Sequence, residues 1–592
     1  MARVWFDAAT LEVIEPTEAD AAAREEIGKI YARLDAAAGK TDVLLSVALP
    51  DAVAGSPTRK APLAEWLKQW DSIREPGVKY TSKTEIAGVS LAGSEATVRV
   101  RQSATTTRDG TTRSSAATNT DKWARQDRDW KLKESLMTSY REVEPPTDPE
   151  STKRVVAELK QKIVPLNTPE AGKPYEDLAA FGKAVGDARI VALGEATHGT
   201  REIFQMKHRL LEYPVEEKGF TVFAIEANWP ESQSLDRYVK TGEGDPKAGL
   251  REMYFWTWQT EEVLAMVEWM RAYNKDAGKR PKLSFTSFDM QTYKVALGRV
   301  VEYLTANAPA DVATVESAYA KLRELVTSQK FPDPLFREAV PGAKRVVELM
   351  ESQREALTKA SSPAAFRDAL QAARIVVQAA EVRTPGATSS YRDQMMAKNT
   401  EWLASEAFPG EKIVLWAHNG HVGTNGSEGF RPMGSWLRDV YRDRMYVLGF
   451  AIHKGDVRAV TWENGRSIGL ISSPVPAAPE GSGSAVLSAA GTPIFFLNMK
   501  SLEGAETLSA WLGRRHLFRQ CGAAWNREDA VNNNMGSSVL SRSFDGLIFF
   551  EESHAARGPE LGCLRIPLRR EAHDRSQDAA GQHDLEVIVA RE

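Results

Sequence analysis

Two short motifs in this chain contain imidazoles, and a carboxylate belongs to the first of them. The first is Glu195-x-x-His198, the second is His418-x-x-His421, and Glu226 stands between them in the sequence. A carboxylate beside an imidazole fixes its tautomer and stabilises the imidazolium, which makes a general base that works near neutral pH. A single Glu-x-x-His pair is more often a surface or capping arrangement. Three of only nine histidines lie in these motifs, however, so we predict a site that activates water.

Each of these side chains follows a short apolar segment. The segments are residues 190–193, 221–225, 283–288 and 413–416, and they lead to Glu195, Glu226, Asp289 and His418. Such segments alternate with helical patterns, which is typical of parallel strands joined by helices. In an open parallel sheet, ligands bind at the carboxyl ends of the strands. We therefore expect residues far apart in the sequence to meet at one edge of the sheet.

The rest of this region predicts further elements of an α/β fold. Residues 445–450 and 546–550 have the composition of additional strands, and residues 295–407 have an almost wholly helical pattern. We expect a large helical insertion that covers the sheet. The segments 476–491 and 569–582 are of low complexity and are predicted to be loops.

The first 145 residues differ in character. Helical patterns over 22–38 and 62–74 precede four extended segments at 78–90, 96–107, 111–125 and 129–140. This order, with the WxRxxxxWKL string at 123–132, resembles the NTF2-like (SnoaL-like) fold. That resemblance implies a small α+β cone that holds either a small-molecule pocket or a homodimer face. The PPTDP segment at 145–149 predicts a linker, and hence domains at 1–145 and 146–592.

Composition excludes several classes of protein. The chain has 592 residues, with 76 Lys and Arg against 80 Asp and Glu, so no overall positive field exists to hold a nucleic acid. The longest uncharged stretch, 481–499, is interrupted by Gly, Ser and Pro, and we predict no membrane span. The chain has only two cysteines, Cys521 and Cys563, which are too few for a disulfide scaffold. Whether these two form one disulfide is left open by the sequence. The opening residues lack the apolar segment of a signal peptide, which fits either a cytoplasmic protein or a secreted one without its leader.

Familiar catalytic motifs are missing from the sequence. It contains no Gly-x-Ser-x-Gly elbow, no complete phosphate-binding loop and no His-Glu-x-x-His metal motif. A serine triad is therefore disfavoured.

Four ordered strings make a more specific resemblance. They are GEATHGT at 194–200, AIEANWP at 224–230, FWTW at 255–258 and WAHNGH at 416–421. Together they resemble the erythromycin esterase family, over roughly residues 150–560. The resemblance implies hydrolysis of an ester or macrolactone with neither a metal cofactor nor a covalent intermediate. Resistance to macrolide antibiotics is one biological role that fits this resemblance, but the resemblance does not require it.

The resemblance also implies catalytic roles. His198 would be the general base and Glu195 its neighbour in the water site. Glu226 matches the second carboxylate of the family, His418 the later histidine that assists at the carbonyl or leaving oxygen, and His421 completes that motif.

Other residues are expected on the substrate side. The family commonly has an arginine nine residues after the base, where this chain has Lys207, which keeps the charge but loses the planar fork. Arg209 is the alternative cation. The aromatic pair Trp256 and Trp258 is expected either to line a hydrophobic cleft or to pack in the core. The remaining candidates for substrate binding are Asp289 and Arg392.

Two alternatives remain open from the sequence. In a metal-dependent hydrolase, Glu195, His198, Glu226 and His418 would be ligands for zinc or manganese, and His421 or Asp289 would be the base. In a binding protein, the N-terminal cone would capture a small apolar molecule and the larger domain would have lost turnover. The intact carboxylates and histidines favour an enzyme whose partner is a small ester or lactone.

Overall fold

The structure is a computed structural model, and it describes residues 18–37, 40–56, 59–72, 79–108, 111–143, 149–276, 278, 281–328, 330–426, 430–463, 466–527, 530 and 534–558. The chain divides into two compact units, of which the first is Met1–Thr147 and the second is mainly Asp148–Pro567. The predicted linker at 145–149 falls almost entirely outside the described residues, as do the predicted loop at 569–582 and Cys563. Within the described part of the chain, no helix combines the length and apolar character that crossing a membrane requires.

The first unit contains the two predicted helices and the four predicted extended segments, together with further short elements. Its helices are α1 (Glu18–Ala36), α2 (Thr41–Ser46) and α3 (Leu63–Ser72). A six-stranded sheet has the order β2-β1-β6-β5-β4-β3, antiparallel except where β1 runs parallel to β6. The strands are β1 (Ala48–Ser56), β2 (Arg59–Pro62), β3 (Lys79–Ala92), β4 (Glu95–Arg108), β5 (Thr111–Gln126) and β6 (Asp129–Val143). Helix α2 and the strands β1 and β2 were not predicted, because the pattern between residues 40 and 62 is short and irregular.

The first unit has its own apolar core. Ile27 of α1 and Trp123 of β5 are completely buried there, together with Val98 of β4. Helix α1 packs against β3, so the helix covers one face of the sheet. This is the helix-on-sheet arrangement that the predicted NTF2-like cone implies.

The second unit is built on a mostly parallel sheet. Its main path runs β10-β9-β11-β8-β12-β18-β14-β7, and every pairing from β10 to β18 is parallel. Strands β14 and β7 extend this sheet in the antiparallel sense. The strands are β7 (Val164–Pro165), β8 (Ile190–Leu193), β9 (Val222–Asn228), β10 (Ser284–Asp289), β11 (Ile413–Trp416), β12 (Met445–Glu463), β14 (Ile494–Asn498) and β18 (Gly546–Ser553).

Both faces of the central strands are buried. Along β8, Ile190 and Ala192 belong to one apolar cluster, whereas Val191 and Leu193 belong to a second. Side chains alternate between the two faces of a strand, so each cluster is the core on one side of the sheet. This double burial explains why these strands have continuous apolar sequences instead of an alternating pattern.

Helices cover the sheet on both faces. Around the cluster that contains Leu193 lie α5 (Ala179–Val185), α6 (Arg201–Lys218), α7 (Gln233–Thr241), α8 (Pro246–Glu252) and α9 (Glu261–Asp276). The opposite cluster includes residues of α4 (Pro149–Lys162), α17 (Met433–Tyr441), α18 (Gly483–Ser488), α19 (Glu506–Leu512) and α20 (Leu540–Ser543). The helix α18 lies inside the predicted loop 476–491.

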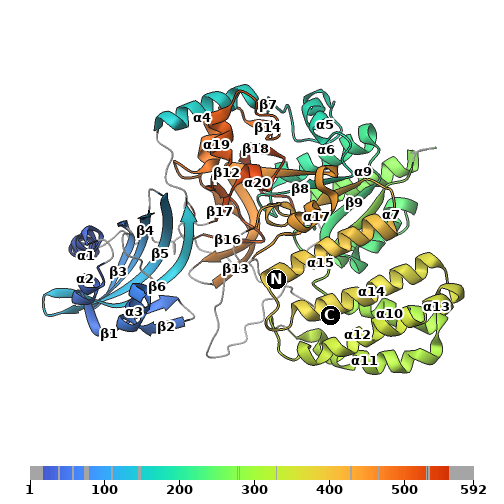
Figure 1. Ribbon diagram of the computed structural model, residues 1–592, viewed down its shortest axis with the longest axis horizontal. Coiled ribbons are helices and arrows are strands. Elements are labelled where there is room, and N and C mark those ends of the chain that lie inside the picture. The colour runs from blue at the N-terminus through green and yellow to red at the C-terminus, as the bar shows by residue number, and fades with distance from the viewer. Residues whose placement is uncertain are drawn as a thin grey trace, which may run out of the picture. The chain divides into compact units, whose positions relative to one another are not determined.

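The predicted helical insertion is confirmed. It consists of α10 (Lys294–Asn307), α11 (Val312–Glu324), α12 (Phe336–Ser352), α13 (Arg354–Ala360), α14 (Pro363–Val382) and α15 (Ser389–Trp402), and it ends in a π-helical turn at Leu403–Ala407. Figure 1 shows α10 to α14 gathered in one group, while α15 runs toward the sheet. Helix α15 contacts β10 and α17, so this last helix of the insertion brings its side chains to the sheet edge.

The sheet is larger than the sequence predicted. Strand β12 continues to Glu463, well past residue 450, and pairs with β13 (Arg466–Val475), β15 (His516–Arg519) and β16 (Ala524–Asn526). Strand β17 (Met535–Ser538) pairs with β15. These strands are short or polar, so tertiary pairing forms them where the local pattern is weak.

Candidate active site

The Glu195-x-x-His198 motif forms a loop that follows β8 directly. The two glycines that flank this motif are needed because other parts of the chain lie too close to them to leave room for a side chain. A Cβ atom at Gly194 would lie 2.2 Å from Asn419 Oδ1, and one at Gly199 would lie 1.8 Å from the backbone oxygen of Arg458. The loop is therefore held between the His418 segment on one side and β12 on the other.

Glu195 is completely buried and pairs with three groups. Its Oε1 lies 2.5 Å from His198 Nδ1, while its Oε2 accepts hydrogen bonds from Lys207 Nζ at 2.8 Å and from Trp416 Nε1 at 2.7 Å. Burial raises the pKa of Glu195, but the Lys207 charge and His198 outweigh it and hold that pKa below its ordinary value. Glu195 is therefore a carboxylate at neutral pH, positioned to orient the His198 ring.

Lys207 lies beneath this carboxylate instead of on a substrate surface. It is completely buried on α6, its Nζ lies 4.3 Å from the centroid of the Trp416 ring, and it also donates to the Ala417 oxygen at 3.4 Å. Burial lowers the pKa of Lys207 to about 8, against the attraction of Glu195. The lysine stays charged at neutral pH and neutralises Glu195.

The end of β9 carries the second carboxylate. Glu226 Oε1 accepts from Arg392 Nη2 at 2.8 Å, and Glu226 Oε2 accepts from the backbone N–H of His418 at 2.9 Å. Arg392 also binds both oxygens of Asp289, at 3.2 Å and 2.7 Å, and thus joins the ends of β9 and β10. Burial raises the pKa of Glu226, but His421 and Arg392 outweigh it and hold that pKa far below its usual range. Glu226 is an anion that fixes the backbone of His418.

His421 is held between two carboxylates. Its Nδ1 lies 2.9 Å from Asp393 Oδ1, and its Nε2 lies 3.3 Å from Glu226 Oε1 and 3.2 Å from Arg392 Nη1. Burial lowers the pKa of His421, but Asp393 and Glu226 outweigh it and raise that pKa to about 10. Asp393 also accepts from the backbone N–H of Met433, which fixes it to the start of α17. The two carboxylates therefore favour the protonated form of His421, against the nearby Arg392 guanidinium.

The two remaining imidazoles face each other across the loops. The ring centroids of His198 and His418 are 5.0 Å apart, and the Trp258 ring contacts His198 edge-on at 6.0 Å. The Glu195 carboxylate favours the His198 tautomer with its proton on Nδ1, which leaves the lone pair on Nε2. His418 Nδ1 accepts from the Gly420 N–H at 3.2 Å, which puts the proton of a neutral His418 on Nε2. The pair thus combines a base and a hydrogen-bond donor.

The other predicted substrate-side residues lie in different surroundings. Arg209 is buried in an ion pair with Asp177 at 2.6 Å, and it also donates to the Thr168 and Pro174 oxygens, so the structure does not bring it to this cluster. Trp258 is buried and donates to the Glu226 backbone oxygen. Trp256 is half-buried, and its ring centroid lies 5.6 Å from the Arg458 guanidinium carbon.

Sequence reasoning missed two members of the cluster. Asp393 follows Arg392 on α15; Arg392 reaches Glu226 and the Nε2 side of His421, whereas Asp393 reaches the Nδ1 side of His421. Trp416 was assigned only to the apolar β11 strand, although its indole N–H binds Glu195. An adjacent Arg-Asp pair carries no periodic signal that would have identified it.

The carboxylates are arranged for cationic side chains. Each oxygen of Glu195 and Glu226 already has a nitrogen partner at 2.5 to 2.9 Å, from His198, Lys207, Trp416, Arg392 or the His418 backbone. Among the residues that the structure describes, no group of three or more His, Cys, Asp and Glu is placed to hold a metal ion.

Comparison with known proteins decides the family. Residues 215–553 match the erythromycin esterase family model, described as "Erythromycin esterase", and this span is more than half of the chain. The chain belongs to the erythromycin esterase family. The matched span contains Glu226, Arg392 and His418, while Glu195 and His198 precede it.

Individual relatives agree with this assignment. The Bacillus subtilis (strain 168) protein named "Putative hydrolase YbfO" is 23% identical over 425 residues, 66% of this chain and 90% of that protein. Erythromycin esterase type II of Escherichia coli is 24% identical over 332 residues, 51% of this chain and 78% of that protein. The solved structure of an erythromycin esterase mutant in its open conformation aligns with a TM-score of 0.51 and 18% identity, over 64% of this chain and 94% of that chain. The last comparison establishes a shared fold.

Proposed function

We propose that this hydrolase of the erythromycin esterase family cleaves a carboxylic ester or lactone by general-base activation of water, without a covalent intermediate. The observation that carries the proposal is the 2.5 Å contact between His198 Nδ1 and Glu195 Oε1, in a carboxylate that Lys207 keeps ionised. A buried carboxylate in this position stabilises the imidazolium that forms when His198 takes a proton.

The steps follow from the two imidazoles. The water oxygen attacks the carbonyl carbon while His198 Nε2 accepts one water proton, and a tetrahedral oxyanion results. His418 Nε2–H lies on the facing ring and donates a hydrogen bond to the developing oxyanion. When the C–O bond breaks, the imidazolium of His198 returns its proton to the leaving alkoxide. An acid and an alcohol are the products.

The other charged residues would act by positioning. Glu226 holds the His418 backbone, and Arg392 and the His421 cation neutralise Glu226. In the metal-dependent alternative, Glu195 and His198 would bind the metal ion and give up the contact between them. Glu195 would also give up its ion pair with Lys207, which would leave a buried ammonium without its carboxylate. The ion-pair network supports the metal-independent route.

The proposal is tested with the full chain and a set of lactones and simple aryl esters, with product masses measured. We expect His198→Asn to keep the fold and to lower kcat by about two to four orders of magnitude. His208→Asn is a matched control, because His208 lies on α6 beside Trp269, outside the cluster. A folded His198→Asn protein with half of the original activity would remove His198 from its role.

A further inference from the structure

A pocket lies directly beside the loop that carries His418. Asn419 and Gly420, which follow His418, form part of its wall. Gln520 forms another part, and the next residue, Cys521, donates its backbone N–H to the Ala196 oxygen at 2.9 Å. The pocket wall therefore includes the two residues that follow His418, and its Gln520 directly precedes the residue whose backbone binds the Glu195–His198 loop.

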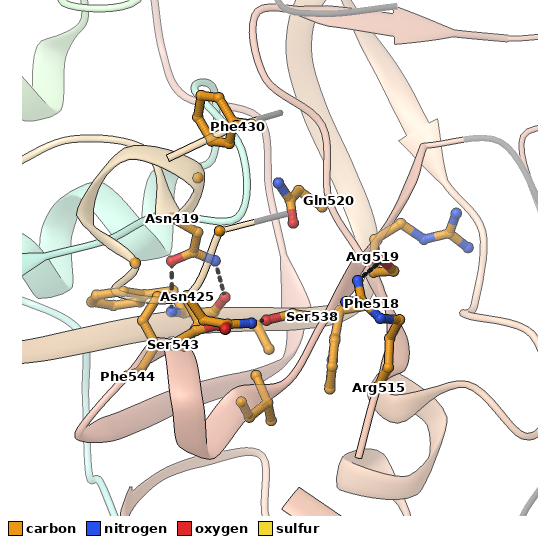
Figure 2. A pocket seen from close by; sticks show the side chains of 17 residues that line it. Asn419, Asn425, Phe430, Arg515, Phe518, Arg519, Gln520, Ser538, Ser543 and Phe544 are labelled. Atoms are coloured by element: carbon orange, nitrogen blue, oxygen red, sulfur yellow. Dashed lines mark hydrogen bonds between the residues drawn. The ribbon is translucent and has the colours of Figure 1, made fainter. Parts of the chain in front are cut away.

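The pocket is small, and its wall combines four phenylalanines with polar side chains and glycines. Its volume is about 220 Å³, and Figure 2 shows Asn419 and Phe544 on one side, with Phe518 and Arg515 on the other. Phe450 also lines the pocket. The side chains of Phe450, Phe518 and Phe544 are buried, which gives them fixed positions. A cavity of about 150 Å³ lined by apolar side chains is large enough to bind benzene. The pocket accordingly fits a single substituted ring and is too small for a whole macrolactone.

The charge of the wall has one sign. None of the 17 described residues that line the pocket is acidic, whereas Arg515 and Arg519 are both among them. Arg519 is buried and donates to the backbone oxygens of Pro476 and Ala477, so it contributes charge and not a free hydrogen-bonding edge. Arg515 is half-buried, and in the described part of the chain its guanidinium donates to a neutral partner, Ser537 Oγ, at 3.1 Å. Among the described residues no carboxylate pairs with this guanidinium, and a guanidinium beside phenylalanine side chains suits a carboxylate ligand.

From this juxtaposition we propose that the pocket is a substrate subsite that selects esters carrying a single-ring apolar group with an anionic carboxylate, with Arg515 as the residue that determines specificity. The inference rests on the proposed esterase function, because it assigns a substrate class to that same site. It also implies that esters with a cationic amine are poor substrates, since the positive wall repels them.

The first experiment measures selectivity. The probes are 4-acetoxybenzoate, which carries the anion on the alcohol side, monomethyl terephthalate, which carries it on the acid side, and their neutral analogues phenyl acetate and dimethyl terephthalate. We expect Arg515→Gln to lower the ratio of kcat/KM for anionic over neutral ester at least about tenfold for one of the two pairs, the loss typical of a charged hydrogen bond. Arg542→Gln is the matched control, because Arg542 is exposed on α20 near the pocket but does not line it. An unchanged ratio in Arg515→Gln would overturn the proposal.

A variant of opposite sign provides a second measurement. Gln520→Glu keeps the size of the side chain and places a negative charge in the wall. We expect it to weaken benzoate binding, measured by calorimetry, about tenfold, and to raise kcat/KM for 4-(trimethylammonio)phenyl acetate relative to phenyl acetate. Equal benzoate affinity in the wild-type and Gln520→Glu proteins would count against the subsite.

Direct binding separates this inference from the proposed function. Wild-type protein should bind benzoate at least about tenfold more tightly than benzamide, and Arg515→Gln should remove that difference. If benzoate binds in this way and none of the esters is hydrolysed, the pocket stands as a carboxylate-binding site and the proposed function fails. If the esters are hydrolysed and benzoate binds no better than benzamide, the function stands and the subsite is wrong.

Discussion

Replacing Lys207 by methionine would test the charge balance on which the proposed base depends. The change keeps the length of the side chain and its packing against Trp416, but removes the ammonium that lies 2.8 Å from Glu195. At an effective dielectric constant of about 20, two unit charges at this distance attract each other by about 6 kcal/mol. Part of that attraction offsets the loss of hydration of the ammonium, which methionine does not require.

Breaking a buried ion pair by removing one partner typically costs about 3–5 kcal/mol. We expect Lys207→Met to lower the free energy of unfolding by this amount, because Glu195 is left as a buried carboxylate with only His198 and the Trp416 indole as partners. The pKa of Glu195 should rise, and the esterase activity should fall with it.

The double variant Lys207→Met with Glu195→Gln separates stability from function. It removes both charges together, so we expect it to recover at least about 2 kcal/mol relative to Lys207→Met. Its activity should stay low, because a neutral amide cannot stabilise the His198 imidazolium.

The assay is equilibrium denaturation of the full chain, followed by tryptophan fluorescence and circular dichroism, with turnover of an aryl ester measured in parallel. Lys218→Met, in the last turn of the same helix, is the control and should change the free energy of unfolding by less than about 0.5 kcal/mol. If Lys207→Met were as stable as the wild type, Glu195 would not be a carboxylate neutralised by Lys207, and this account of the base would be refuted.

Three further predictions follow from the same structure. The pKa of His421 is raised to about 10 from its ordinary value of 6.5, so the contribution of the protonated ring to stability is complete below pH 6.5 and is lost as the pH rises through 10. The stability advantage of the wild type over His421→Gln should therefore shrink by up to about 1.4 kcal/mol per pH unit between about pH 7 and 10; a difference that does not change with pH would contradict the assignment. Prolonged chelation should leave turnover unchanged, with less than about one equivalent of transition metal by elemental analysis, whereas reversible loss rescued by zinc or manganese would favour the metal-dependent alternative. A fragment that begins at Asp148, and so keeps α4 with its buried Val155 and Leu159, should hydrolyse a small ester; a soluble but inert fragment that regains activity when the N-terminal unit is added would place that unit in the active site.

The sequence by itself determined four parallel strands of the sheet and the residues at their ends. Buried parallel strands have continuous apolar sequences, so β8, β9, β10 and β11 are visible locally, and so are the polar residues that follow them. The helical insertion and the four long strands of the first unit are visible for a different reason, because each of these elements is long enough to show its period. The four ordered motifs also carried the resemblance to the family that comparison then established.

Only the tertiary structure determined which charged side chains form ion pairs with one another. Lys207 was expected to meet substrate, yet it lies beneath Glu195, because the position of α6 against β11 is not encoded in any local pattern. Asp393 became a partner of His421 only through the packing of α15 against α17, and the pocket beside Asn419 only through the pairing of β15 with β12 and β17. Periodicity reports which face of an element is buried, whereas ion pairs and pockets depend on how separate elements pack in three dimensions.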